Sequence, residues 1–186
     1  AQSIYHSGER PVPVEISEDD LLVSTKAIEA AITKKTIGIM PVHVNGRCCQ
    51  MDKILDIANR YSLKVFEDSA QAMGAKYDGR SAGSVGDWGT YSFYPSKTLG
   101  CFGDAGALVT NSDEIYEKVI AMRNHGADEN KTIPLETDIW GTNCRLDNVQ
   151  AAILSFKMGY YTEVIERRRQ IAQAYHDTLN KYYDVR

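Results

Sequence analysis

The sequence has few of the features that mark secreted, membrane-spanning or nucleic-acid-binding proteins. Its 186 residues include only four cysteines, with no Cys-x-x-Cys pair and no disulfide-framework spacing, which favours a reducing compartment such as the cytoplasm. No apolar run is long enough to span a bilayer. Basic residues do not exceed acidic ones (21 against 25, net charge −4), and a nucleic-acid partner would require a basic face. We therefore predict no membrane partner and no nucleic-acid partner.

The remaining composition is that of a folded globular domain. Hydrophobic residues make up 43% of the chain and charged residues 25%, so the chain can bury enough apolar surface to offset its ordering entropy. The length allows one domain of ordinary size. The sequence contains no internal repeat, low-complexity tract or obvious linker.

Strand-like and helix-like segments alternate along the chain. Apolar and β-branched runs predict strands at 36–44, 63–66, 90–94 and 107–110. Helical spacing of apolar residues predicts helices at 27–31, 51–58, 111–123, 146–158 and 162–182. Ser24 and Thr25 precede the first of these helices and could cap it. Asn111 and Glu114 have the spacing of a capping box. This alternation predicts an α/β fold with a mostly parallel sheet and helices on both faces.

Three chemically useful side chains lie at or just after predicted strand ends: Asp68, Ser92 and Lys97. Ligands of such sheets bind beyond the carboxyl ends of the strands, so we expect these residues on one edge. Most lysines are solvated surface groups, but Lys97 follows Pro95 in a hydroxyl-rich, glycine-flanked loop, where burial would make it a usable nucleophile or base. A Schiff-base lysine that binds pyridoxal phosphate also needs a carboxylate at the pyridine nitrogen, which Asp68 could supply.

Two glycine-containing motifs have simple structural explanations. The segment 79–83 (GRSAG) matches the GxSxG elbow of hydrolases, but its surroundings are turn-like rather than strand and helix, which favours a surface turn. Gly100, Gly103 and Gly106 could cradle a phosphate or allow a tight turn between two strands, and we favour the turn.

Two further clusters are also better explained without a ligand. His43, Cys48 and Cys49 lack the spacing of a structural zinc site, so we predict no metal. His43 could face the ligand edge or pack at the end of its strand. The run 167–169 (RRR) is typical of a solvated helix face.

Several segments, in the right order, resemble one family. They are 67–79 (EDSAQAMGAKYDG), 86–100 (GDWGTYSFYPSKTLG), 103–111 (GDAGALVTN), 122–126 (MRNHG) and 141–154 (GTNCRLDNVQAAIL). From about Arg10 to beyond Arg169 the chain resembles the DegT/StrS-type sugar aminotransferases, which are fold-type I pyridoxal-phosphate enzymes. The resemblance implies that residues 1–158 are the central part of the cofactor-binding large domain, which would be incomplete. It also implies that residues 159–186 are a long helix leading toward a small C-terminal domain that is absent.

The resemblance implies a role for each matching residue. Lys97 is the catalytic residue, which forms the imine link to pyridoxal 5′-phosphate and then moves the proton between cofactor and substrate carbon. Asp68 pairs with the pyridine nitrogen, Gln71 lies beside the phenolic oxygen of the ring, and Ser92 hydrogen-bonds the phosphate. Asn143 reaches the phosphate of the neighbouring subunit's cofactor, in a homodimer with shared active sites. Arg145 supports that loop.

The resemblance also implies the reaction. It is the transfer of an amino group from glutamate to a keto group of a nucleoside-diphosphate-linked sugar, in amino-sugar and polysaccharide biosynthesis in the cytoplasm. Lys97 favours transamination, since related members that remove a sugar hydroxyl carry histidine there. Asn45, Met73 and Thr142 depart from the family pattern on the substrate side, which leaves the sugar open.

Two alternatives remain. One is a pyridoxal-phosphate-dependent sugar dehydratase of the same fold, and the other is a non-catalytic dimerisation or regulatory domain. Members of the family are longer than this chain, and the segment that completes the phosphate cradle is expected before Ala1. We therefore expect the 186-residue chain alone to bind the cofactor weakly or not at all.

Overall fold

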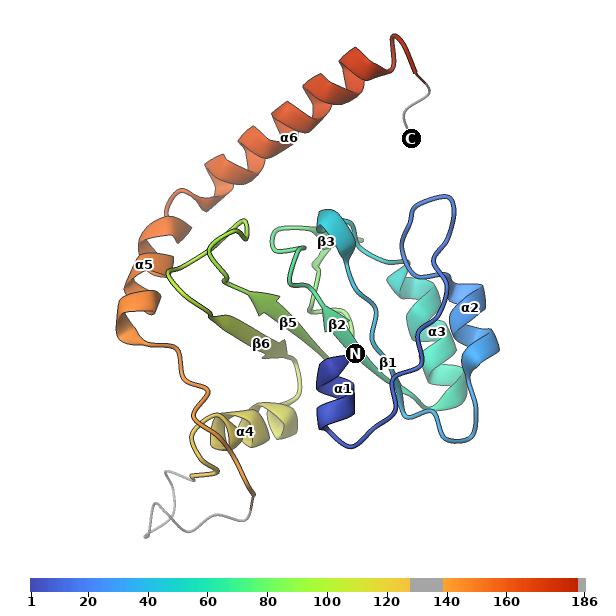
Figure 1. Ribbon diagram of the computed structural model, residues 1–186, viewed down its shortest axis with the longest axis vertical. Coiled ribbons are helices and arrows are strands. Elements are labelled where there is room, and N and C mark those ends of the chain that lie inside the picture. Colours follow the sequence, from blue (N-terminus) through green and yellow to red (C-terminus); the bar gives the residue numbers. More distant parts are fainter. Residues whose placement is uncertain (128–138, 184–186) are drawn as a thin grey trace. The chain divides into compact units, whose positions relative to one another are not determined.

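The computed structural model describes residues 1–127 and 139–183 (Figure 1). The chain forms two compact units. The first comprises Ala1–Tyr91 and Leu108–Ser112, and the second comprises Ser92–Ala107 and Asp113–Arg186.

The central sheet has four strands in the order β1-β2-β5-β6. Their bounds are Gly38–Ile39, Lys64–Asp68, Trp88–Ser92 and Gly106–Thr110. β1 pairs in parallel with β2, and β2 pairs in parallel with β5, with Asp68 opposite Thr90. The arrow of β6 runs opposite to that of β5 in Figure 1. The predicted α/β fold with a mostly parallel sheet is therefore confirmed.

The first strand is much shorter than the run 36–44 predicted. β1 contains only Gly38 and Ile39, because Pro41 lacks the N–H that a continued ladder requires. Pairing resumes as an isolated bridge between Val42 and Asp68. The chain then turns through the short 3₁₀ segment Val44–Gly46, in which Asn45 has a φ of 55°. The segment predicted as one strand therefore forms the short strand β1 and, separately, an isolated bridge to the end of β2.

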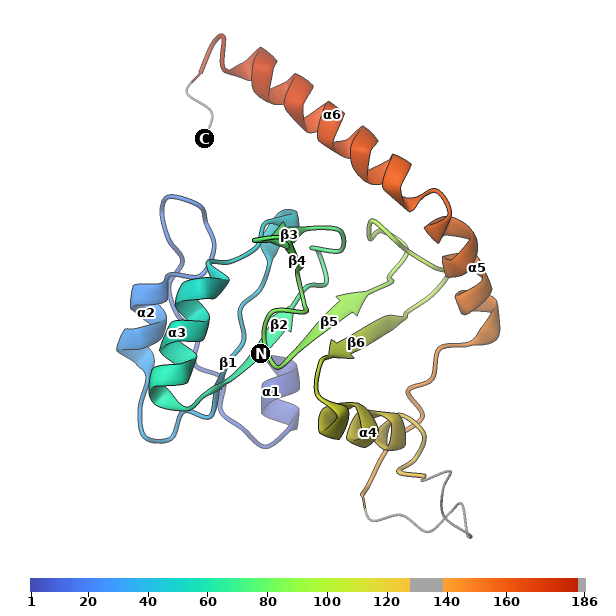
Figure 2. The same ribbon diagram turned by 180° about the vertical axis from the view of Figure 1, so that it is seen from behind.

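The core of the first unit lies between the sheet and two helices that are side by side in Figures 1 and 2. α2 (Thr25–Ala31) begins where the Ser24 hydroxyl accepts a hydrogen bond from the Ala27 N–H, as predicted. α3 (Met51–Tyr61) presents one apolar stripe to the core. The buried residues of this core include Leu22, Ile28, Ile39, Met51, Ile54, Ile57 and Val65.

A small antiparallel hairpin carries the GxSxG motif. β3 (Lys76–Tyr77) and β4 (Arg80–Ser81) are joined by Asp78 and Gly79, which both have positive φ angles (48° and 76°). Paired positive φ values are those of a type I′ turn, for which Asp-Gly is a preferred sequence. Ser81 is exposed, and the next element after β4 is strand β5, not a helix. This geometry excludes a hydrolase elbow and confirms the surface turn.

The short helix α1 (Gln2–His6) was not predicted. The other helices, which are close to their predicted bounds, are α4 (Asp113–Met122), α5 (Asn148–Met158) and α6 (Tyr161–Leu179). The capping box predicted at Asn111 and Glu114 is wrong, because α4 begins at Asp113 and the Asn111 amide donates to the Ser84 carbonyl (3.3 Å). A capping box does begin α5, where Gln150 accepts from the Asp147 N–H.

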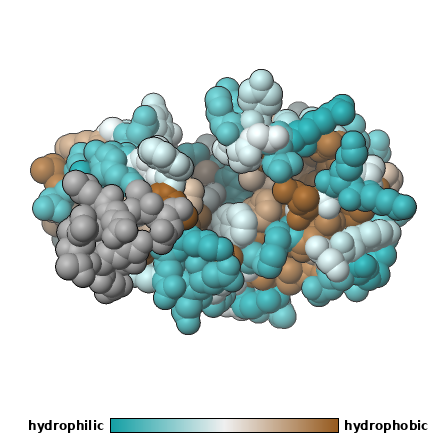
Figure 3. Space-filling model, turned by 90° about the horizontal axis from the view of Figure 1, so that it is seen from below, coloured by the Kyte–Doolittle hydropathy of each residue, from teal (hydrophilic) through white to brown (hydrophobic). Residues whose placement is uncertain are grey.

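Polar residues cover much of the surface. The run Arg167 to Arg169 is exposed on α6, as predicted for a solvated helix face. Figure 3 shows hydrophilic residues interspersed with hydrophobic ones on one face of the molecule. Within the part of the chain that the structure describes, no helix is both long and apolar enough to cross a membrane.

The buried position of Ile54 gives a direct test of this core. We expect Ile54→Ala to lower the free energy of unfolding by about 2–5 kcal/mol, since Ile54 is 0% exposed and its removal leaves a cavity. The matched control is Ile37→Ala, where the side chain is 57% exposed and the loss should be below about 1 kcal/mol. Urea denaturation of the protein at its natural length measures both. Equal losses would contradict this core.

Candidate active site

Asp68 is the last residue of β2 and lies at the carboxyl end of a parallel strand, where the sequence placed it. Its N–H donates to the Pro41 carbonyl (2.9 Å), and its own carbonyl accepts from the His43 N–H (3.0 Å). The carboxylate is half-buried, and its Oδ1 accepts from the Ala70 N–H (3.1 Å). Within residues 1–127 and 139–183, no group donates a hydrogen bond to Oδ2. Oδ2 of Asp68 is therefore available to accept a hydrogen bond.

Gln71 lies in the turn that follows Asp68. The Ala72 N–H donates to the Ser69 carbonyl (2.9 Å) and closes this turn. The exposed Gln71 side chain accepts from the Asn45 N–H through Oε1 (2.9 Å). Because the amide oxygen is engaged, the amide N–H₂ group is the part of Gln71 that can donate to a ligand. The structure thus brings Asp68 and Gln71 together on one unit.

Ser92 and Lys97 belong to the second unit. Ser92 ends β5, and its Oγ accepts from the Tyr94 N–H (3.3 Å). The Lys97 N–H donates to the Tyr94 carbonyl (2.9 Å) and closes a four-residue turn with Pro95 at its second position. The Lys97 side chain is half-buried. Its backbone is therefore held in a defined turn directly after the strand.

The glycine loop after Lys97 supports that turn. A Cβ atom on Gly100 would lie 2.6 Å from both the Tyr94 and the Pro95 carbonyl oxygens, so only glycine lets the backbone pack this closely. The Gln150 amide donates to the carbonyls of Phe102 (2.9 Å) and Asp104 (3.1 Å). The loop is therefore a tight connection between β5 and β6, as we favoured, and α5 holds it in place.

Asn143 is exposed on the second unit and forms an antiparallel bridge with Asn124. Arg145 donates through Nε to Asn143 Oδ1 (3.1 Å) and through a terminal nitrogen to Asn124 Oδ1 (3.3 Å). Arg145 thereby joins the two asparagines. The predicted site residues thus fall into two groups: Asp68 and Gln71 on the first unit, and Ser92, Lys97 and Asn143 on the second.

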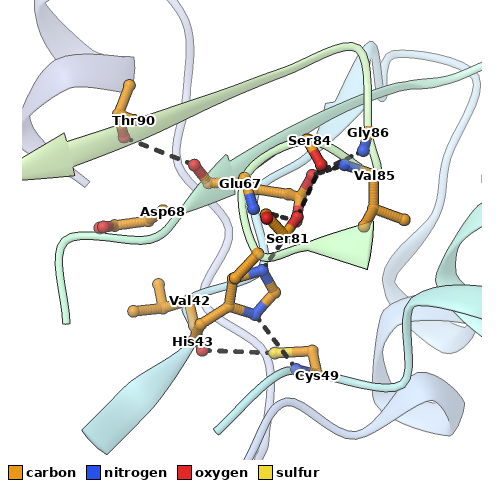
Figure 4. Close-up of polar contacts among 12 residues, drawn as sticks. Val42, His43, Cys49, Glu67, Asp68, Ser81, Ser84, Val85, Gly86 and Thr90 are labelled. Carbon is orange, nitrogen blue, oxygen red and sulfur yellow. Dashed lines mark hydrogen bonds and ion pairs between the residues drawn. The ribbon is translucent and has the colours of Figure 1, made fainter. Parts of the chain in front are cut away.

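Sequence reasoning missed the most buried polar cluster, which lies directly beside Asp68 (Figure 4). Glu67 is 1% exposed and His43 is 0% exposed. Glu67 Oε1 accepts from the N–H groups of Val85 (2.7 Å) and Gly86 (2.6 Å). Glu67 Oε2 accepts from the Gly83 N–H (2.8 Å) and lies 2.9 Å from His43 Nε2. The two oxygens of this buried carboxylate therefore make four hydrogen bonds in total.

One signal in the sequence pointed to this cluster. Strand side chains alternate between the two faces of a sheet, and Val65 is a core residue, so Glu67 falls on the same core-facing side. A carboxylate at a core position requires hydrogen-bonding partners. The sequence could not show that these partners come from His43 and from the loop 83–86.

The hydrogen bonds keep Glu67 ionised. Burial by itself would raise the pKa of Glu67, but the hydrogen bonds from His43 and from three backbone N–H groups outweigh burial and hold its pKa below the ordinary value. The neighbouring thiol has the opposite behaviour, because burial raises the pKa of Cys49 to about 11. Glu67 is therefore an anion and Cys49 a neutral thiol at neutral pH.

His43 and Cys49 make contacts that leave them unsuited to bind a metal. The Cys49 N–H donates to His43 Nδ1 (3.1 Å), and the Cys49 thiol donates to the Val42 carbonyl (3.3 Å). Both ring nitrogens of His43 are thus engaged. Among residues 1–127 and 139–183, no group of three or more His, Cys, Asp and Glu side chains is arranged to hold a metal ion. Of the two roles open to His43, packing at the strand end is the correct one.

Taken together, the predicted residues have the chemistry that pyridoxal phosphate requires. Asp68 offers a carboxylate oxygen for a protonated pyridine nitrogen, and Gln71 offers an amide N–H₂ for the phenolic oxygen. Ser92 offers a hydroxyl for the phosphate, and Lys97 offers an amine for the aldehyde. The donor set therefore fits this cofactor.

Solved structures identify the class of protein to which this fold belongs. DesV of S. venezuelae, solved in complex with a ketimine intermediate, superimposes with a TM-score of 0.89 at 38% identity over 96% of this chain and 47% of its own. NtdA of Bacillus subtilis, solved with bound PMP, superimposes with a TM-score of 0.81 at 35% identity over 98% of this chain and 42% of its own. The fold is that of a pyridoxal-phosphate-dependent aminotransferase domain.

The chain belongs to the DegT/DnrJ/EryC1/StrS aminotransferase family, whose sequence pattern matches residues 1–185. A dTDP-3-amino-3,4,6-trideoxy-alpha-D-glucose transaminase of Micromonospora megalomicea subsp. nigra is 43% identical over 98% of this chain and 48% of its own length. A pleiotropic regulatory protein of Geobacillus stearothermophilus is 43% identical over 94% of this chain and 46% of its own. The chain spans about half the length of the curated relatives it matches.

The buried carboxylate predicts a specific pH dependence of stability. We expect Glu67→Gln to lower the free energy of unfolding at neutral pH by about 3–5 kcal/mol, because its amide would place a donor against backbone donors. The folded-state pKa of Glu67 is depressed, so its contribution is present above the unfolded-state pKa and is lost as the pH falls through the folded-state pKa. The difference from wild type should therefore shrink in acid.

Urea denaturation at a series of pH values measures this difference. Glu18→Gln is the matched control, since Glu18 is exposed and the change should have little effect at any pH. A Glu67→Gln difference that stays constant or grows as the pH falls would contradict the ionised, hydrogen-bonded state of Glu67.

Proposed function

We propose that the protein is a pyridoxal-phosphate-dependent aminotransferase that moves an amino group from glutamate to a keto group of a nucleoside-diphosphate-linked sugar. The main support is the position of Lys97 in this chain, which belongs to the aminotransferase family. Lys97 lies in a turn closed by a backbone hydrogen bond directly after β5, and β5 pairs with β2 at Asp68. A module with no catalytic role would have no need for this lysine together with a carboxylate at the neighbouring strand end.

Each residue then has a defined task toward the cofactor. Asp68 holds a proton on the pyridine nitrogen through its open carboxylate oxygen. Gln71 donates its amide N–H₂ to the phenolic oxygen, an orientation that the Asn45 N–H supports. Ser92 donates its hydroxyl to the phosphate. Asn143, oriented by Arg145, extends to the phosphate site of a neighbouring subunit in a homodimer.

Lys97 performs the proton transfers. When bound, pyridoxal phosphate supplies the electron sink for the bond that breaks next to the amino nitrogen. Lys97 would hold the cofactor through its side-chain amine. The same amine would move a proton away from the donor carbon and return it, so one group would act first as base and then as acid.

The substrate, location and domain assignments rest on the family. A nucleotide-linked keto-sugar is the natural acceptor, since the Micromonospora relative carries the name of a dTDP-amino-sugar transaminase. Glutamate as donor, a homodimer with shared sites and a cytoplasmic location complete the proposal. The proposal also includes a large-domain portion at 1–158 and a connecting helix at 159–186, within which α6 falls.

A regulatory role is the second candidate, because the relative from Geobacillus stearothermophilus is named a pleiotropic regulatory protein. The two candidates differ in what they require of Lys97. An aminotransferase needs its amine for turnover, whereas a regulatory module that acts through binding alone does not.

Amino transfer can be measured with the protein at its natural length. We expect the wild type to form 2-oxoglutarate from glutamate in the presence of dTDP-linked or UDP-linked 3-keto or 4-keto hexoses. Lys97→Ala should reduce this rate by about a thousandfold or more, because it removes both the cofactor link and the base. Lys34→Ala, at an exposed lysine, should leave the rate unchanged. A wild type that aminates none of these sugars would contradict the proposal.

A further inference from the structure

Glu67 and Asp68 are consecutive residues of β2, so their side chains lie on opposite faces of the sheet. Figure 4 shows them pointing away from each other, Glu67 into the buried cluster and Asp68 toward the other side. The buried carboxylate is tied by its four hydrogen bonds, whereas the Asp68 carboxylate has one. Any rotation of the strand end that moved Asp68 would therefore also break the contacts of Glu67.

The hydrogen bonds determine which nitrogen of His43 carries the proton. Nδ1 accepts from the Cys49 N–H, so it presents a lone pair and the proton is on Nε2. Nε2–H then donates to Glu67 Oε2. His43 is thus a neutral donor that is fully buried, and it cannot act as a base toward a ligand.

His43 also contacts Asp68 through its backbone. Its N–H donates to the Asp68 carbonyl (3.0 Å), while the Asp68 N–H donates to the Pro41 carbonyl (2.9 Å). One residue therefore restrains two consecutive residues of β2, Glu67 through its ring and Asp68 through its main chain. The Thr90 hydroxyl adds a further contact to the Glu67 carbonyl (3.4 Å).

We propose that His43 and Glu67 are a positioning pair that sets the direction of the Asp68 carboxylate toward the pyridine nitrogen of the cofactor. The proposal rests on the proposed function, since it requires that pyridoxal phosphate binds beside Asp68. A charge-assisted hydrogen bond needs its donor and acceptor to be well aligned, so a small rotation of Asp68 would weaken its hold on the pyridine proton. In metal sites, loss of the groups that orient a ligand costs about tenfold to hundredfold.

A network with only a structural role would make a different prediction. If His43 and Glu67 merely attach β2 to the loop 83–86, their removal lowers stability but leaves the pyridine nitrogen of bound cofactor protonated. The protonation of that nitrogen is therefore the decisive observable. It can be read from the ¹⁵N chemical shift of pyridoxal phosphate labelled at the ring nitrogen.

We expect the wild-type protein at its natural length to show a protonated pyridine nitrogen. His43→Leu should move the ¹⁵N shift toward that of neutral pyridine and weaken cofactor binding by about tenfold to hundredfold. His43→Gln retains an N–H donor toward Glu67 and should restore most of both properties. His6→Leu, at an exposed histidine of α1, is the control and should match the wild type.

A second variant covers the case in which His43→Leu does not fold. Glu67→Asp keeps the charge but shortens the side chain by one methylene, so it cannot reach both His43 and the loop 83–86. We expect it to shift the ¹⁵N signal in the same direction. Wild-type ¹⁵N shifts in the folded variants, with only the melting temperature lowered, would overturn the positioning role and leave the proposed function intact. A wild type that binds no pyridoxal phosphate would overturn both.

Discussion

The buried carboxylate of Glu67 is the interaction on which the rest of the first unit depends. An ionised group that is 1% exposed is stable only when its acceptor sites are filled, and Glu67 fills them with His43 and with three N–H groups of residues 83–86. These partners come from the segment after β1 and from the loop before β5. One side chain of β2 therefore joins the segments on both sides of it, and the end of β2 has little freedom to rotate.

The placement of Asp68, the next residue of β2, follows from this arrangement. Because side chains alternate along a strand, fixing Glu67 on the buried side presents Asp68 on the other side. On the second unit, the backbone at Lys97 is held in place by different contacts. There the Tyr94–Lys97 turn and the close approach of Gly100 define the backbone that carries the amine. In both places, a candidate site residue lies on a short segment that backbone hydrogen bonds hold, which is how a site keeps its geometry before a ligand arrives.

Local patterns in the sequence predicted the elements that depend on local forces. The apolar stripe of α3, the Ser24 cap of α2 and the alternation that produced the parallel sheet were all readable from neighbouring residues. The position of Asp68 at the end of a strand followed from the same patterns. The prediction of one strand over 36–44 gave too little weight to Pro41, which interrupts the ladder after β1. The His43–Glu67 pair was not readable, because it joins residues 24 apart in the chain, a contact that no local pattern encodes. The capping box placed on Asn111 failed for the same reason, since that side chain bonds Ser84, which lies 27 residues away.

Borohydride trapping tests the central claim, that Lys97 is the cofactor-binding lysine, most directly. The protein at its natural length is incubated with pyridoxal phosphate, reduced, digested and analysed by mass spectrometry. The account predicts that the reduced cofactor is concentrated on the peptide containing Lys97 and is absent from that position in Lys97→Ala. Label scattered over exposed lysines, with no enrichment at Lys97, would contradict the account.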